Sequence, residues 1–79
     1  MSVRTTIDTI FQQVAREQQR TLSQLSNDVR LMDTGLDSLS FALIVARLED
    51  TLGVDPFQNV DSFPVTFGDF VKLYENHPQ

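Results

Sequence analysis

Residues 37–53 read DSLSFALIVARLEDTLG, and this stretch decides the fold. Asp and Ser are preferred at the N-terminal cap of a helix, and Gly is common just past the C-terminal end. The stretch therefore predicts a helix that begins at Asp37 or Ser38 and ends before Gly53. Its core-facing apolar residues are spaced three, one, three and four positions apart, which places them on one side of a helix. They are Phe41, Ile44, Val45, Leu48 and Leu52.

A second apolar strip lies on the same predicted helix, displaced around it from the core-facing stripe and starting beside Ser38. A domain of 79 residues has one modest core and cannot easily bury both strips. Two interpretations stay open: the additional apolar residues fill the core of a tight bundle, or they form a docking surface for a partner. The strip consists of Leu39, Ala42, Leu43 and Ala46.

Outside this helix the sequence predicts four more segments. Residues 3–19 have the apolar spacing of an amphipathic helix. Residues 21–36 lose that spacing and predict a long connection, and long connections are often functional. Residues 57–63 predict a short helical segment before Pro64, and a last helix is expected after Thr66, a good N-cap. The apolar residues expected to pin the connection to the core are Leu22, Leu25, Val29, Leu31, Met32 and Leu36.

No segment shows the alternation of a strand. The predicted fold is therefore all-α, a small bundle of three main helices plus one short helix, with a long loop between the first and the second helix. Residues 1–79 are expected to form a single domain. We expect the last helix to end before Asn76-His77-Pro78.

The composition limits the setting and the chemistry. The chain has no Cys, so disulfides and thiolate metal sites are excluded and a reducing, cytoplasmic location is expected. The longest apolar run, residues 41–46, is too short for a membrane span, and the N-terminal residues lack the apolar block of a secretion signal.

The net charge of −5 is concentrated in the middle of the chain. Residues 31–61 contain six carboxylates and one basic residue, Arg47. Nucleic-acid affinity comes largely from clustered Lys and Arg, so we expect no nucleic-acid partner. Basic proteins are the natural complement of such a segment, and an acidic surface kept for solubility is the alternative interpretation.

The sequence offers no catalytic constellation. The one histidine, His77, lies three residues from the C-terminus and is poorly placed to act as a base for Ser38. Ser38 lacks the G-x-S-x-G setting of a nucleophile elbow. Asp33 and Asp37 do not have the spacing of a calcium-binding loop, so no catalytic residue and no organised metal site is expected.

Residues 33–39, DTGLDSL, resemble the phosphopantetheine attachment motif of acyl and peptidyl carrier proteins, in which an Asp-Ser-Leu triplet opens the second helix. The likeness extends over nearly the whole domain. Residues 47–54, RLEDTLGV, are similar to the continuation of that helix in the family, and residues 66–70, TFGDF, are similar to the start of its last helix.

The resemblance implies that a phosphopantetheinyl transferase joins 4′-phosphopantetheine from coenzyme A to Ser38, using Mg²⁺. The terminal thiol would then bear acyl, aminoacyl or polyketide intermediates as thioesters, so the chain would be a carrier and not an enzyme. Asp37 is expected to orient the transferase. Other implied partners are the enzyme that loads the cargo and a synthase, ligase or acyltransferase that uses it. The expected partner-binding residues are Asp37, Leu39, Leu43, Ala46, Glu49 and Asp50.

One departure from the family pattern concerns the residues after the motif. Carriers of fatty-acid synthesis usually have several acids in the first two turns of this helix, whereas here the acids wait until Glu49 and Asp50. This favours apolar recognition and a specialised biosynthetic pathway. Because the chain begins at Met1 and ends without an evident linker, we expect a stand-alone, monomeric carrier.

Two other classes of function stay open at this point. The first is an unmodified, carrier-like helical bundle that acts as an interaction or assembly subunit, with Ser38 serving only as a helix cap. The second is a small acidic hydrolase or regulator that uses Asp33, Asp37 and Ser38. We expect a chain this short to have no enzyme-like substrate pocket, and this expectation and the missing base argue against the second class.

Overall fold

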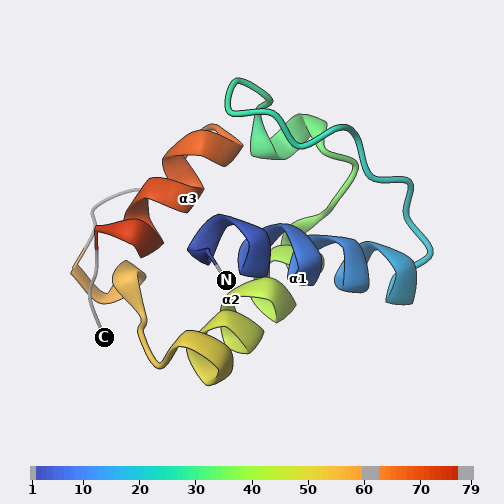
Figure 1. Ribbon diagram of the computed structural model, residues 1–79. Helices are drawn as coiled ribbons and strands as arrows, with labels where there is room; N and C mark the ends of the chain where they lie inside the picture. Colours follow the sequence, from blue (N-terminus) through green and yellow to red (C-terminus); the bar gives the residue numbers. More distant parts are fainter. Residues whose placement is uncertain (1, 60–62, 77–79) are drawn as a thin grey trace.

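The computed structural model describes residues 2–59 and 63–76, and the regular elements of this part of the chain are all helical (Figure 1). Among the described residues the only bridge between extended segments joins Arg30 to Thr66, and no named strand is present. The predicted all-α bundle with three main helices is confirmed. The elements are α1 (Val3–Glu17), the 3-10 turn η1 (Leu31–Asp33), α2 (Ser38–Leu52), the 3-10 turn η2 (Pro56–Asn59) and α3 (Phe67–Glu75).

The ends of α2 and α3 lie where the sequence predicts them. The Asp37 side chain accepts a hydrogen bond from the backbone N–H of Ser40 and caps α2. Gly53 ends this helix with a φ of 74°, in the left-handed region that glycine adopts without steric cost. Thr66 caps α3 by accepting from the backbone N–H of Asp69.

The first helix ends at Glu17, two residues before the predicted boundary. The N–H of Gln19 donates to the carbonyl of Arg16, and the N–H of Arg20 donates to that of Ala15. This pair of bonds is a Schellman motif, with Gln19 in the left-handed position at a φ of 56°. Glycine usually occupies that position, so the sequence does not signal the end of this helix.

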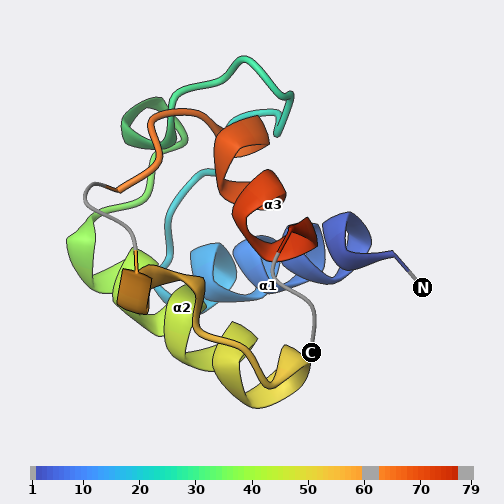
Figure 2. The same cartoon turned by 90° about the vertical axis from the view of Figure 1, so that its left-hand side faces the viewer.

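Phe11 lies at the centre of the core and touches rings from the other two long helices. Its ring meets Phe67 and Phe70 of α3 edge-on, with centroids 5.2 and 5.4 Å apart, and Phe41 of α2 at 6.1 Å. In Figure 1, α1 lies between α3 above it and α2 below it, and the view in Figure 2 agrees. Edge-to-face contacts of this kind add to the stabilisation that comes from burying the rings.

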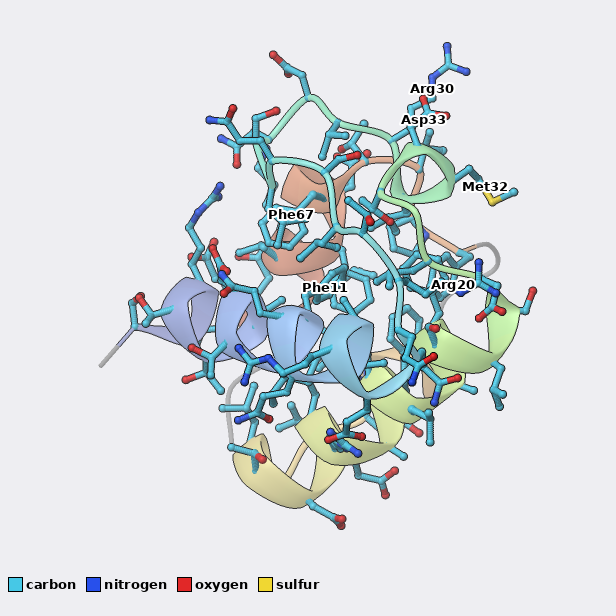
Figure 3. All side chains as sticks on the ribbon, turned by 90° about the vertical axis from the view of Figure 1, so that its right-hand side faces the viewer. Phe11, Arg20, Arg30, Met32, Asp33 and Phe67 are labelled. Atoms are coloured by element: carbon cyan, nitrogen blue, oxygen red, sulfur yellow. The ribbon has the colours of Figure 1, made fainter. Side chains whose placement is uncertain are left out.

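The long connection between α1 and α2 is pinned to the bundle, as predicted. Leu31 and Leu36 are buried, and Leu22, Leu25 and Val29 pack partly against the core. Met32 is the exception, because its side chain is 84% exposed, and Figure 3 shows it pointing away from the body of the protein. The expectation that Met32 pins the loop is therefore wrong.

Backbone contacts fix the same connection. The N–H of Leu31 donates to the carbonyl of Val65 at 2.9 Å, which ties η1 to the segment before α3. Gly35 has a φ of 96°, and a Cβ at this position would collide with the carbonyl oxygen of Thr21. Only glycine fits here, so Gly35 allows the turn before α2 to pack directly against the backbone of Thr21.

The short helical segment is only partly as predicted. Its described part forms a 3-10 turn over Pro56–Asn59, which begins one residue before the predicted segment. Residues 60–62 of that prediction lie outside the described residues, as do His77 and Pro78 at the C-terminal end.

The core facing of α2 and α3 can be tested by truncation. Ile44 and Phe70 are completely buried, so Ile44→Ala or Phe70→Ala should lower the free energy of unfolding by about 2–5 kcal/mol. Leu39→Ala is the matched control on α2, because Leu39 is 59% exposed and its loss should change stability by less than about 0.5 kcal/mol. Thermal unfolding followed by far-UV circular dichroism measures the difference. Melting of Ile44→Ala at the wild-type temperature would contradict the assigned facing of α2.

Candidate functional site

The candidate site is the N-terminal end of α2, where Ser38 is the first helical residue and is exposed. The N–H groups of the first turn of a helix have no acceptor within the helix, and the helix dipole makes this end positive. Asp37 satisfies one of these groups, because its side chain accepts from the N–H of Ser40; its carbonyl accepts the first bond of the helix itself, from the N–H of Phe41. The hydroxyl of Ser38 therefore lies at an end of α2 that favours an anion.

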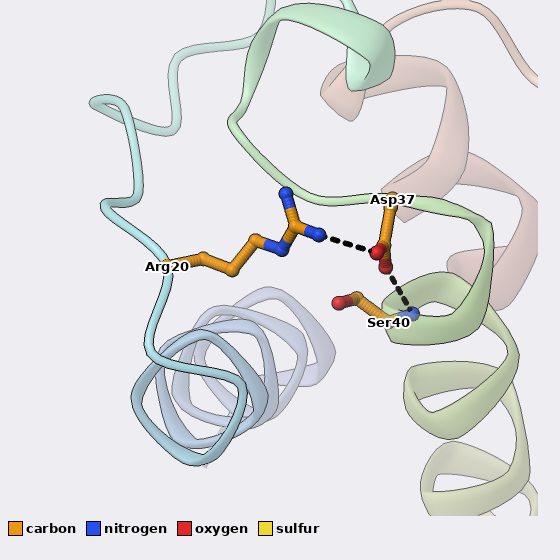
Figure 4. Close-up of polar contacts among 3 residues, drawn as sticks. All are labelled: Arg20, Asp37 and Ser40. Atoms are coloured by element: carbon orange, nitrogen blue, oxygen red, sulfur yellow. Dashed lines mark hydrogen bonds and ion pairs between the residues drawn. The ribbon is translucent and has the colours of Figure 1, made fainter.

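Asp37 connects this helix end to the preceding loop. Its Oδ1 accepts from the Ser40 N–H at 2.9 Å, and its Oδ2 lies 2.6 Å from Nη2 of Arg20 (Figure 4). The Ser40 N–H is the main cause that holds the pKa of Asp37 below its usual range; the nearby Ser40 hydroxyl adds to this effect, and Arg20 contributes a further attraction. Asp37 is therefore a carboxylate with both oxygens engaged.

Two serines lie close together here, and the fold distinguishes them. Ser38 is exposed, whereas Ser40 is completely buried and its hydroxyl makes no hydrogen bond of acceptable geometry among the described residues. Only the Ser38 hydroxyl is accessible to another protein.

An apolar groove with a volume of about 960 Å³ begins beside Ser38 and follows one side of α2. Its opposite wall comes from η1, which lies shortly before α2 in the sequence, and from the segment before α3, which lies after it. Charged side chains occur along its edge, including Arg30, Asp33 and Glu49. The apolar lining includes Met32, Phe41, Ala42, Val45, Phe63 and Val65.

The described large hydrophobic side chains that are exposed all gather around this helix end. We call this set the apolar rim; it consists of Met32, Leu39, Phe63 and Val65. Three of its members line the groove together with Ser38, and the fourth is the next residue in the chain. Exposed apolar side chains in one patch mark interaction surfaces more often than scattered ones do.

The structure divides the second apolar strip of the sequence analysis. Leu39 belongs to the apolar rim, and Ala42 and Ala46 are exposed and line the groove. Leu43, by contrast, is half-buried and packs against the core. Neither interpretation of the strip therefore holds for all four residues.

The acidic residues expected to bind partners are dispersed along α2. Glu49 lines the groove, Asp50 is exposed, and Asp37 caps the helix at the other end. The sequence pattern does not indicate Phe63 or Val65 as site residues, and it places Met32 in the core. Phe63 and Val65 line the groove because the segment before α3 packs against η1, and apolar spacing along the chain does not show that Met32 faces outward there.

Neither a metal site nor a membrane segment is found in the part of the chain that the structure describes. Within residues 2–59 and 63–76, no three or more potential metal-ligating side chains come together. No described helix has the length and apolar character that crossing a membrane requires.

An exposed serine at the start of a helix, in a small helical bundle with an apolar groove, is suited to hold a group that other proteins attach and process. The family model for the phosphopantetheine attachment site matches residues 6–57, more than half of the chain. The chain belongs to this family, which confirms the resemblance. No curated protein and no solved structure gives a significant match.

Membership of the family defines the general function. The protein is a phosphopantetheine-bearing carrier, with 4′-phosphopantetheine attached covalently to a serine. Carrier domains of this family are generally non-catalytic, and they interact with enzymes that modify them and with enzymes that use their cargo. The remaining questions are which serine carries the group and how partners recognise it.

The charge on Asp37 should appear in the pH dependence of stability. Because its pKa is lowered in the folded state, the stabilisation is present above the pKa of the unfolded chain and is lost as the pH falls through the folded value. Asp37→Asn keeps a capping side chain but removes the charge. When the pH is lowered from about 5 to about 3, the melting temperature of the variant should therefore fall less than that of wild type.

Glu17 provides a second, independent contribution to compare. Its hydrogen bonds with Arg47 lower its pKa, so Glu17→Gln should also reduce the fall in melting temperature between about pH 5 and pH 3. The double variant, with both Asp37→Asn and Glu17→Gln, should show a smaller fall in melting temperature than either single variant. An Asp37→Asn melting curve with the same acid dependence as wild type would contradict the assigned interactions of Asp37.

Proposed function

We propose that Ser38 carries the 4′-phosphopantetheine and that the chain bears acyl, aminoacyl or polyketide intermediates as thioesters on it. The observation that carries the proposal is the contrast among the serines inside the matched region, residues 6–57. Ser38 alone opens a helix with an exposed side chain, whereas Ser40 is buried and Ser23 donates its hydroxyl to the carbonyl of Asp33. Ser26 lies in the long connection and is not the first residue of a helix.

The attachment reaction is compatible with this position. The Ser38 oxygen would attack the phosphorus that bears the pantetheine arm in coenzyme A, forming a phosphodiester and releasing adenosine 3′,5′-bisphosphate. The hydroxyl proton would pass to a base of the transferase, because both oxygens of the neighbouring Asp37 carboxylate are already engaged. The new phosphodiester is an anion, and the positive end of α2 favours it.

Partner enzymes are proposed to dock on the apolar rim around Ser38. The proposed docking surface also includes Asp37 and Ala46 next to the rim, and Glu49 and Asp50 farther along α2. Two observations support apolar recognition: the rim borders Ser38, and the two turns of α2 that follow Ser38 contain no carboxylate. This pattern supports a specialised biosynthetic pathway over housekeeping fatty-acid synthesis. We expect the carrier to work as a cytoplasmic monomer.

The choice of serine is tested by modification in vitro. Incubation with coenzyme A, Mg²⁺ and a broad-specificity phosphopantetheinyl transferase should add one phosphopantetheine per chain. Ser38→Ala should prevent the addition, and Ser40→Ala, the matched control, should accept it. Intact-protein mass spectrometry distinguishes these results. Modification of Ser38→Ala would contradict the assignment, and an unmodified wild type with several transferases would favour the unmodified interaction subunit.

The docking surface is tested by placing charge on the rim. Met32→Asp and Val65→Asp should keep the wild-type melting temperature, because both side chains are exposed. They should weaken binding of a processing enzyme by about fivefold or more, since the loss of one well-packed apolar contact costs more than about 1 kcal/mol. Binding should persist as ionic strength rises.

Two controls separate docking from folding. Thr9→Asp adds the same charge at an exposed position of α1 and should leave partner binding unchanged. Leu43→Asp should instead lower the melting temperature, because this side chain packs against the core. Unchanged binding of both rim variants would overturn the proposed docking surface.

A further inference from the structure

Arg20 reaches from the start of the long connection to the cap of α2. Its guanidinium nitrogen Nη2 lies 2.6 Å from Asp37 Oδ2, and the two side chains are 43% and 41% exposed. The pair joins residues that are 17 positions apart in the sequence and brings a cation next to the residue that precedes Ser38 (Figure 4). Nothing in the helix cap itself requires this cation, because Asp37 caps α2 through its other oxygen.

The fold does not depend on the Arg20 side chain. Its backbone N–H, which any residue except proline would supply, closes the end of α1 on the carbonyl of Ala15. The N–H and hydroxyl of Ser23 donate to the carbonyls of Thr34 and Asp33, which holds the connection near α2 independently. An exposed ion pair of this kind contributes little to stability. The position of the Arg20 guanidinium therefore calls for another explanation.

We propose that Arg20 is a specificity-determining residue that masks Asp37 from cationic groups of partner enzymes approaching Ser38. The proposal rests on the proposed function of Ser38. Both oxygens of the Asp37 carboxylate are engaged within the chain, one by the Ser40 N–H and one by Arg20. A partner lysine or arginine that contacts this carboxylate must compete with Arg20 for it and also meets the positive charge of Arg20.

The consequence of the masking is selectivity between classes of partner. An enzyme that recognises the start of α2 mainly through cations loses affinity, whereas one that uses the apolar rim does not. Specificity of this kind comes from an element that disfavours the wrong partner. It complements the absence of acids from the early turns of α2, since the acid beside Ser38 is neutralised locally by Arg20.

The test uses steady-state kinetics of phosphopantetheine transfer by a transferase that recognises carriers through basic residues. Arg20→Gln should lower the KM for the carrier about two- to fivefold, the range that exposed ion pairs account for. The kcat should not change, because Arg20 touches none of the reacting atoms. At about 1 M salt, where charges are screened within a few Å, the KM difference should disappear.

Three variants make the result specific. Arg20→Lys keeps the charge and should behave as wild type, and Arg16→Gln removes a nearby exposed charge on α1 and should have no effect. In the Asp37→Asn background, Arg20→Gln should no longer lower the KM, because the group that it masks has lost its charge. The melting temperatures of all the variants at neutral pH show that the fold is retained.

The possible outcomes separate this inference from the proposed function. A wild-type chain that accepts phosphopantetheine on Ser38, together with an unchanged or raised KM for Arg20→Gln, would overturn the masking role alone. A lowered KM that persists in the Asp37→Asn background would also overturn it. Failure of the wild type to be modified, or modification of Ser38→Ala, would overturn the proposed function and the inference with it.

Discussion

The burial of Phe11 between rings from α2 and α3 is the constraint on which the rest of the structure depends. A 79-residue chain without disulfides has only one core to hold its helices, and this ring joins all three of the long ones. The contact with Phe41 fixes the rotation of α2 about its own axis. Because residues two apart on a helix point to different sides, that rotation buries Ser40 and exposes Ser38.

The Asp37 side chain then couples the helix end to its surroundings. It satisfies the Ser40 N–H, binds Arg20 and lies directly before Ser38. One carboxylate thus contributes to folding and determines the charge that an approaching partner meets. The surface around Ser38 differs from one dominated by acids, because exposed apolar side chains border it and Arg20 lies against Asp37.

The parts of the fold that follow from local patterns were predictable. The cap at Asp37, the end at Gly53 and the cap at Thr66 each have a short sequence signature, and the structure bears them out. The end of α1 was not predictable from the sequence, because Gln19 and not a glycine adopts the left-handed conformation there. The assignment that failed concerns which way an apolar residue faces, because Met32 is exposed and does not pin the loop to the core.

The apolar rim shows why part of the site was beyond prediction. Met32, Phe63 and Val65 come from segments that meet only in the folded chain, through the bond between Leu31 and Val65 and the packing of η1. Spacing along the sequence predicts one face of one helix and cannot describe a surface assembled from several. The Asp-Ser-Leu triplet, in contrast, lies within one turn, so Ser38 could be singled out from the sequence alone.

The central claim is that the phosphopantetheine is on Ser38, and peptide mapping of the chain isolated together with its own biosynthetic enzymes tests it most directly. Cleavage after Arg30 and Arg47 releases residues 31–47, which contain both Ser38 and Ser40. Fragmentation by tandem mass spectrometry should place the phosphopantetheine on Ser38. Localisation of the group to Ser40 or to a serine outside this peptide would contradict the account.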